Sequence, residues 1–425
     1  MPARFLILSI AVLLVSGCTS ISKGVTQAII EREQVDERQC WIAGRPFEGL
    51  GDVIATGAES DPDKSLPTKL KIMSVHGIGK HAPGYARRLL DGVVEEFGFI
   101  TKDEEIKTIN LLHPEYEEGL GVLTVHRYTN PNDAREILFY ELTWDPIVEQ
   151  EIKIVSYDDS IEFSSKRTPF NHSMKSFINE TVPDALMYNT PYRIPIQTSL
   201  GNSLCWMFSE SWEDLATVES RFCQNDQDNL WSQVNDSSIA ILSHSLGSRI
   251  SIDALELVLK QIHNHPERQA LEDKLKDKPI YLYMLSNQLP LLQVGQPLPE
   301  VYDQTARYCR TDGDLYDQRF FKKLQVVAFS DPNDLFSYAV QPAFINRHVD
   351  SRLCPVVTNV MIEVAHVARL FGDRGIASPQ KAHTEYEADS RVLKMLVSGF
   401  GPEHGHEEVR ERCEFLELVP GEGQF

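Results

Sequence analysis

The chain has 425 residues, a length that suits either one large domain or two. Its hydrophobic content of 42% is typical of a globular protein and excludes wholesale disorder. With 62 acidic against 41 basic residues the formal net charge is −21, and a surface this acidic repels phosphate, which argues against a nucleic-acid partner.

The amino terminus has the pattern of an export signal. After Arg4, residues 5–15 form an almost unbroken apolar run that is too short to cross a bilayer as a helix, so it predicts a signal peptide. The following Val-Ser-Gly-Cys18 resembles the lipobox of bacterial lipoproteins. The resemblance implies cleavage after residue 17, a lipid anchor on Cys18 and, because Thr19 is not Asp, the outer membrane of the cell envelope. The alternative is a plain secretory peptide that is cut elsewhere.

Cysteine usage favours an oxidising compartment. Of the 7 cysteines, six remain once Cys18 is assigned to the lipid, and none has C-x-x-C spacing, so disulfides are favoured over a metal or redox site. We predict the pairs Cys205–Cys223, Cys309–Cys354 and Cys40–Cys413, with buried free thiols as the alternative. Residues 18–45 predict a polar tether between the anchor and a domain spanning 46–425.

A short apolar strand and a glycine-bearing loop begin the predicted sheet. Residues 71–75 lead into His76-Gly77-Ile78-Gly79-Lys80, and apolar residues at helical spacing over 86–94 predict a helix after it. We expect His76 to brace this loop by hydrogen bonds. A phosphate-binding loop is the alternative, but the G-x-x-x-x-G-K-[ST] spacing is absent.

A hairpin and an insertion follow. Residues 122–128 and 136–144 flank a turn and predict two strands that extend the sheet. The segment from this loop to Ser245 is longer than the roughly 60–80 residues that two βαβ steps need. We assign the surplus to an aromatic-rich insertion over 146–232, which is either a cap over a substrate pocket or a small subdomain with its own core.

The clearest motif lies at Ser245. Residues 239–242 predict a short buried strand, Ser243-His-Ser245-Leu-Gly247 follows, and apolar residues at helical spacing predict a helix beyond it. A serine at a sharp strand-to-helix corner is exposed beside the free N–H groups of the new helix, which can bind an anion. The alternative is an ordinary helix start capped by Ser245.

Candidate acidic and basic partners follow later strands. Three apolar runs predict strands of a parallel sheet buried on both faces: residues 279–285, 324–329 and 356–364. Asp331 and Asp334 follow the second run, although Asp331 could instead cap a helix with Asp334 in solvent. His383 precedes the last predicted helix and is the favoured base, with His366 as the alternative.

In this order Ser245, Asp334 and His383 resemble the nucleophile, acid and base of the α/β-hydrolase superfamily, most closely its lipases and esterases. The resemblance covers about residues 70–100 and 236–400, and Asp334 is favoured over Asp331 because apolar residues follow it, as in the family. It implies an α/β-hydrolase fold, a mostly parallel sheet flanked by helices, with a large cap-like insertion between the oxyanion loop and the nucleophile elbow. It also implies an oxyanion hole formed by the N–H groups of Ile78 and Leu246, and no metal or cofactor.

These patterns predict a lipid-anchored serine hydrolase that cleaves carboxylic esters through an acyl-enzyme. Membrane lipids, small esters and polysaccharide esters fit equally well as substrates. The alternative from another class is a non-catalytic hydrolase-fold scaffold or binding lipoprotein of the envelope. Ser243 supports that alternative, because it stands where the family usually has the first glycine of G-x-S-x-G.

Overall fold

The computed structural model describes residues 38–54, 68–99, 105–113, 119–130, 135–215, 234, 237–371, 374–401 and 404–416. The predicted signal peptide and lipid-attachment residue Cys18 lie outside these residues. So does Cys223, the expected partner of Cys205.

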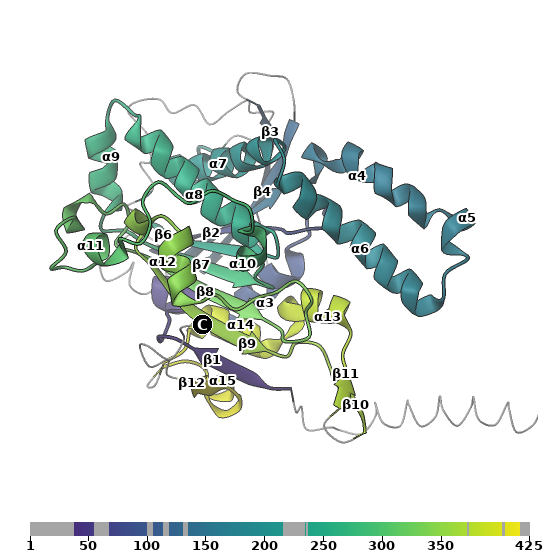
Figure 1. Ribbon diagram of the computed structural model, residues 1–425. Helices are drawn as coiled ribbons and strands as arrows, with labels where there is room; N and C mark the ends of the chain where they lie inside the picture. The colour runs from purple at the N-terminus through teal and green to yellow at the C-terminus, as the bar shows by residue number, and fades with distance from the viewer. Residues whose placement is uncertain are drawn as a thin grey trace, which may run out of the picture. The chain divides into compact units, whose positions relative to one another are not determined.

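The core of the described residues is a sheet in the order β12-β1-β9-β8-β7-β6-β2-β5-β4-β3 (Figure 1). The six strands from β9 to β5 in this order are parallel to one another. At one end β4 pairs antiparallel with β5 and β3, and at the other β1 pairs antiparallel with β9 and parallel with β12. The fold is therefore α/β with a mostly parallel sheet, as predicted. The strands are β1 Cys40–Ala43, β2 Thr68–Val75, β3 Glu105–Leu112, β4 Gly119–Asn130, β5 Arg135–Thr143, β6 Ser237–His244, β7 Pro279–Leu285, β8 Lys323–Ser330, β9 Pro355–Ile362 and β12 Glu414–Leu416.

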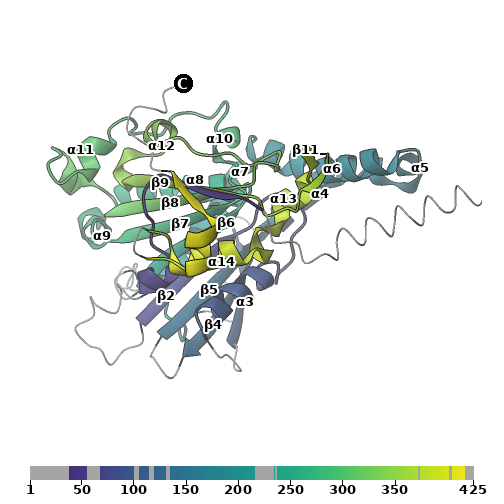
Figure 2. The ribbon, with the colours of Figure 1, turned by 90° about the horizontal axis from the view of Figure 1, so that it is seen from below.

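Helices cover both faces of the sheet. On one face lie α3 (Arg87–Glu96) and α14 (Ser390–Ser398), and on the other lie α7 (Arg193–Ser209) and α8 (Gly247–His263) (Figures 1 and 2). Side chains alternate between these layers: Leu70 and Ile72 of β2 belong to the core under α3 and α14, whereas Met73 and Val75 belong to the core under α8. Burial on both faces explains why the central strands are almost continuously apolar.

The described part of the predicted insertion, residues 146–215, is mostly helical and follows β5. It contains α4 (Glu149–Ser156), α5 (Ile161–Ser164), α6 (Pro169–Tyr188) and α7, of which α4, α5 and α6 project away from the sheet (Figures 1 and 2). By contrast, α7 belongs to the main core, and the buried ammonium of Lys71 on β2 donates to the carbonyls of Met207 and Glu210 at its C-terminal end.

Short elements complete the described chain. They are α9 Arg268–Leu275, α10 Leu289–Leu292, α11 Thr305–Cys309, α12 Pro342–His348, α13 Pro379–Thr384, α15 Glu407–Arg412, and the paired strands β10 Ala368–Phe371 and β11 Arg374–Ile376.

Two predicted disulfides are confirmed. Cys40 is bonded to Cys413 with an S–S distance of 2.13 Å, and Cys309 to Cys354 at 2.16 Å. Cys205 is also disulfide-bonded.

The folded domain begins earlier than expected. Residues 40–43, which were assigned to the tether, form β1, because they pair with β9 and β12 beside the disulfide between Cys40 and Cys413. The folded domain thus begins at or before Cys40.

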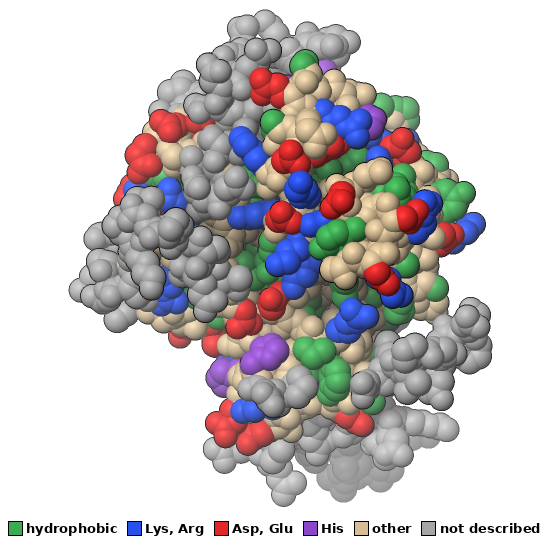
Figure 3. Space-filling view, turned by 90° about the vertical axis from the view of Figure 1, so that its left-hand side faces the viewer, with side chains coloured by type: hydrophobic (Ala, Val, Ile, Leu, Met, Phe, Trp, Pro, Cys, Tyr) green, Lys and Arg blue, Asp and Glu red, His purple; other side chains and the backbone are tan. Residues whose placement is uncertain are grey.

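The surface in Figure 3 carries acidic and basic side chains close together rather than one patch of a single sign. This is the side on which α9 and α11 lie in Figure 1. Charged residues in or beside these two helices are paired: Lys276 with Asp273, Arg307 with Asp314, and Arg310 with Asp312. Within the described ranges, no helix combines the length and the apolar character that a membrane span requires.

Candidate active site

Ser245 occupies a strained corner between β6 and α8. Its φ of 57° lies in the left-handed region, which costs a non-glycine residue about 1–2 kcal/mol. Its N–H donates to the carbonyl of Leu285, which ends β7, at 2.9 Å, so the neighbouring strand helps to hold the turn. A methyl group at Gly247 would lie 2.4 Å from the carbonyl oxygen of Val75, which explains the glycine after the serine. Ser243 fits because its hydroxyl donates to the Tyr283 carbonyl at 3.3 Å.

The structure brings the three predicted triad residues together. His383 Nε2 lies 3.1 Å from Ser245 Oγ, and His383 Nδ1 lies 3.0 Å from both carboxylate oxygens of Asp334. A carboxylate at Nδ1 favours the tautomer with its proton there, which leaves Nε2 free to accept the serine proton. All three side chains are buried, and Ser245 is 0% exposed.

The structure also separates the two candidate acids. The Asp331 carboxylate accepts backbone N–H bonds from Asn333, Val364 and Ala365 and therefore joins two loops. Burial opposes ionisation of Asp334, but hydrogen bonds from His383 and other donors outweigh it and hold the pKa of this carboxyl below its ordinary value.

Of the two candidate bases, only His383 lies at the serine. It sits in the short helix α13, which begins at Pro379 and is capped by Ser378, rather than in the expected loop. His366 is exposed.

The glycine-bearing loop passes directly beside Ser245. A methyl group at Gly77 would lie 2.4 Å from Ser245 Cβ, so only glycine permits this approach. Within the described residues, the N–H groups of Ile78 and Leu246 donate to no protein acceptor. Both are therefore available to an anion that forms at the serine.

His76 braces this loop, as predicted. Trp144 N–H donates to His76 Nε2 at 3.1 Å, which leaves the proton on Nδ1, and Nδ1 donates to the Gly77 carbonyl at 2.9 Å. Burial, followed by the nearby His81, lowers the pKa of His76 well below its ordinary value, so the ring stays neutral. In a trans peptide the N–H points opposite to the carbonyl, so the bond to Gly77 also orients the Ile78 N–H.

Three residues near the triad were not predicted. The Ser286 hydroxyl donates to Asp334 Oδ2 at 2.6 Å and lies 2.9 Å from His383 Nδ1. His244 Nε2 donates to the His383 carbonyl at 2.8 Å, and burial lowers the pKa of His244 to about 3. Phe177 of α6 places its ring 6.0 Å from the His383 ring. In the sequence, Ser286 and His244 were marked only by their positions at strand ends, and Phe177 only as one aromatic residue of the predicted insertion.

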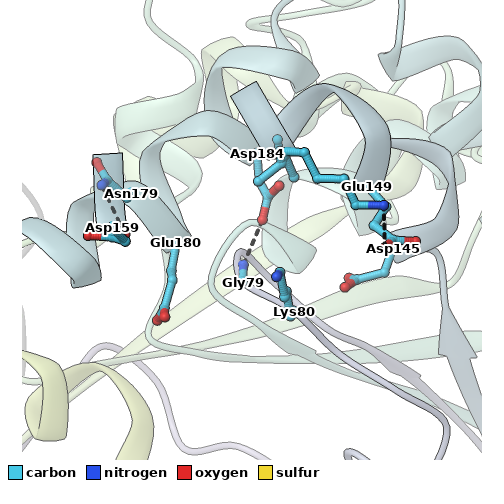
Figure 4. Close-up of a pocket in the computed structure, with 10 residues that line it drawn as sticks. Gly79, Lys80, Asp145, Glu149, Asp159, Asn179, Glu180 and Asp184 are labelled. Atoms are coloured by element: carbon cyan, nitrogen blue, oxygen red, sulfur yellow. Dashed lines mark hydrogen bonds and ion pairs between the residues drawn. The ribbon is translucent and has the colours of Figure 1, made fainter. Parts of the chain in front are cut away.

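A cavity of about 190 Å³ lies between the loop and the insertion (Figure 4). Its lining is mostly charged: Gly79, Lys80, Asp145, Glu149, Ile152, Lys153, Asp159, Asn179, Glu180 and Asp184. Burial raises the pKa of Asp145 to about 6 and that of Asp184 to about 7. Among the described residues, no group of His, Cys, Asp and Glu side chains is arranged to hold a metal ion.

In comparisons with known proteins, no family model, curated protein or solved structure matches the chain.

Proposed function

We propose that this protein is a serine hydrolase of the α/β-hydrolase fold that cleaves carboxylic esters. The observation that carries the proposal is the hydrogen-bonded series from Ser245 through His383 to Asp334, at 3.1 and 3.0 Å. The strained backbone of Ser245 adds support, because such strain concentrates at functional positions. The sheet order with Ser245 after β6 is compatible with this fold.

The residues suit acyl transfer in two steps. Ser245 Oγ bonds to the acyl carbon as its proton passes to His383 Nε2, and the carbonyl oxygen becomes an anion bound by the N–H groups of Ile78 and Leu246. Collapse breaks the ester C–O bond, and His383 returns the proton to the departing alcohol. Water then attacks the acyl-enzyme with His383 as base, which releases the acid and restores Ser245. Asp334 stabilises the imidazolium in both steps.

The proposal includes an envelope location, with Cys18 as the lipid-bearing residue. It rests on the sequence pattern before Cys18, and two disulfides within the described domain are compatible with export. The candidate substrates are membrane lipids, small esters and polysaccharide esters.

One observation favours the non-catalytic alternative: Ser245 is fully buried, beneath an imidazole that Phe177 contacts. A fluorophosphonate probe tests both possibilities. We expect it to label wild-type protein at Ser245 and to leave S245A unlabelled, and we expect S245A to lose p-nitrophenyl ester hydrolysis by about 10⁴-fold or more while staying folded. Absence of labelling in the wild type, beside a labelled esterase control, would support the scaffold role.

A further inference from the structure

The insertion contacts the candidate site through one face of α6. Phe177, Thr181, Asp184 and Tyr188 are buried and are spaced three or four residues apart, so they share a stripe along the helix. Phe177 lies against the His383 ring, and the Tyr188 hydroxyl donates to Asp253 of α8 at 2.7 Å. Between them, Asp184 reaches the oxyanion loop.

Asp184 bonds the loop one peptide beyond the predicted oxyanion donor. Its Oδ2 accepts the N–H of Gly79 at 2.6 Å, as Figure 4 shows. The carbonyl of the same peptide unit, on Ile78, accepts from His81 Nε2 at 3.2 Å. The Ile78–Gly79 peptide is thus held on both edges, by a helix of the insertion and by the loop itself.

The loop needs such support because of its own sequence. Gly79 has φ +97°, a conformation that glycine adopts readily and leaves readily. The Ile78–Gly79 unit joins the preceding unit, which carries the Ile78 N–H, at the Cα of Ile78, so fixing one peptide plane restricts the orientations available to the other. His76 fixes that preceding unit from one side only, through the Gly77 carbonyl.

Other carboxylates hold the rest of the loop in the same manner. Asp145 Oδ2 accepts the His81 N–H at 2.7 Å, and Glu141 accepts the N–H groups of Gly84 and Ala86. Glu141 belongs to β5 and Asp145 follows that strand directly, whereas Asp184 comes from the projecting insertion.

We propose that Asp184 is a positioning residue: by holding the Gly79 N–H it orients the Ile78 N–H toward the oxyanion, so the insertion completes the catalytic site. This inference rests on the proposed hydrolase function. It assigns α6 a role in the rate of the chemical step, beyond covering the imidazole.

Kinetics of D184A, D184N and E180A test the proposal. D184A removes the acceptor, whereas D184N keeps a carbonyl oxygen for the Gly79 N–H. E180A is the matched control, since Glu180 lies one turn earlier on α6, is exposed and points away from Gly79 in Figure 4. For p-nitrophenyl acetate we expect D184A to lower kcat on the order of 10–100-fold, with KM changed less than about threefold. D184N should restore most of kcat, and E180A should match the wild type.

Amide hydrogen exchange over residues 77–79 supplies a readout that is independent of activity. We expect exchange on the order of tenfold faster in D184A than in E180A or D184N, because one hydrogen bond is lost. If D184A does not fold, D184L fills the same volume without an acceptor and replaces it.

The outcomes separate the two proposals. Equal kcat and equal exchange in D184A and E180A would overturn the positioning role while leaving the hydrolase intact. If the wild type cleaves no ester, the hydrolase proposal fails and the positioning role fails with it, even where exchange shows that Asp184 holds the loop.

Discussion

Two regions hold the imidazole of His383 by different means: the C-terminal ends of the parallel strands, called the sheet edge below, and the insertion. Ser245, Ser286 and Asp334 follow the parallel strands β6, β7 and β8 and lie within 3.1 Å of its ring nitrogens. From the insertion, Phe177 makes a ring contact with centroids 6.0 Å apart. Strand ends are fixed by the hydrogen bonds of the whole sheet, whereas the insertion depends on the packing of one helix. Substitutions at the sheet edge should therefore abolish the reaction, and those in the insertion should slow it.

The largest expected effect is on kcat, and it differs between the two aspartates that follow β8. D334N should lower kcat by about 10⁴-fold, because an amide no longer holds the required tautomer of His383. D331N should leave kcat of the folded enzyme within about tenfold but lower the free energy of unfolding by about 1–3 kcal/mol, because it disturbs three backbone bonds. Ester hydrolysis and urea denaturation measure the two quantities. The reverse pattern would make Asp331 the acid.

A smaller effect is expected in the pH dependence of stability. Because burial raises the folded-state pKa of Asp184 to about 7, the folded protein binds more protons at this group than the unfolded chain above pH 4. The contribution of Asp184 is therefore fully present in acid and is lost as the pH rises toward 7. D184N lacks this loss, so its free energy of unfolding relative to the wild type should rise by about 2–3 kcal/mol from pH 5 to pH 8.

Urea denaturation of both proteins at the two pH values measures this difference. The neighbouring Asp145, whose pKa is about 6, titrates in both proteins, and its charge contributes to the raised pKa of Asp184, so the measured difference includes the repulsion between these two carboxylates. A difference that does not change with pH would mean that Asp184 is ionised throughout the range.

The smallest expected effect concerns the aromatic cover. F177A removes a ring contact worth about 0.5–1.5 kcal/mol, so kcat/KM should fall by about 3–10-fold. I178A is the matched control, because Ile178 is the next residue and is 42% exposed. If F177A lowered kcat/KM as much as D334N does, the insertion would be as important for catalysis as the sheet edge.

The sheet edge could be predicted from the sequence better than the contacts of the insertion. The strand before Ser245, the glycine after it and the strands leading to Asp334 and His383 depend on patterns within ten or so residues, and the structure has them where expected. Asp331 and Asp334 could not be distinguished from their order alone, because both follow β8 and the path of the turn decides which one reaches the ring. Ser286 was missed because a single serine after a strand is a common feature.

Contacts between distant segments were harder to predict. Asp184 meets Gly79 across 105 positions of sequence, and only the packing of α6 brings them together. Likewise, residues 40–43 follow a polar, charged run over 31–39 and were assigned to the same tether, but their place in the sheet depends on pairing with the distant strands β9 and β12.

The disulfide between Cys40 and Cys413 has a practical consequence for limited digestion. It joins residues 373 positions apart, so a protease that cuts once at any point between them leaves two fragments linked covalently. Electrophoresis without a reducing agent would show one band of nearly full mass, and addition of a thiol would resolve it into two. A preparation cut once between these cysteines would therefore look intact by non-reducing electrophoresis and cleaved by reducing electrophoresis.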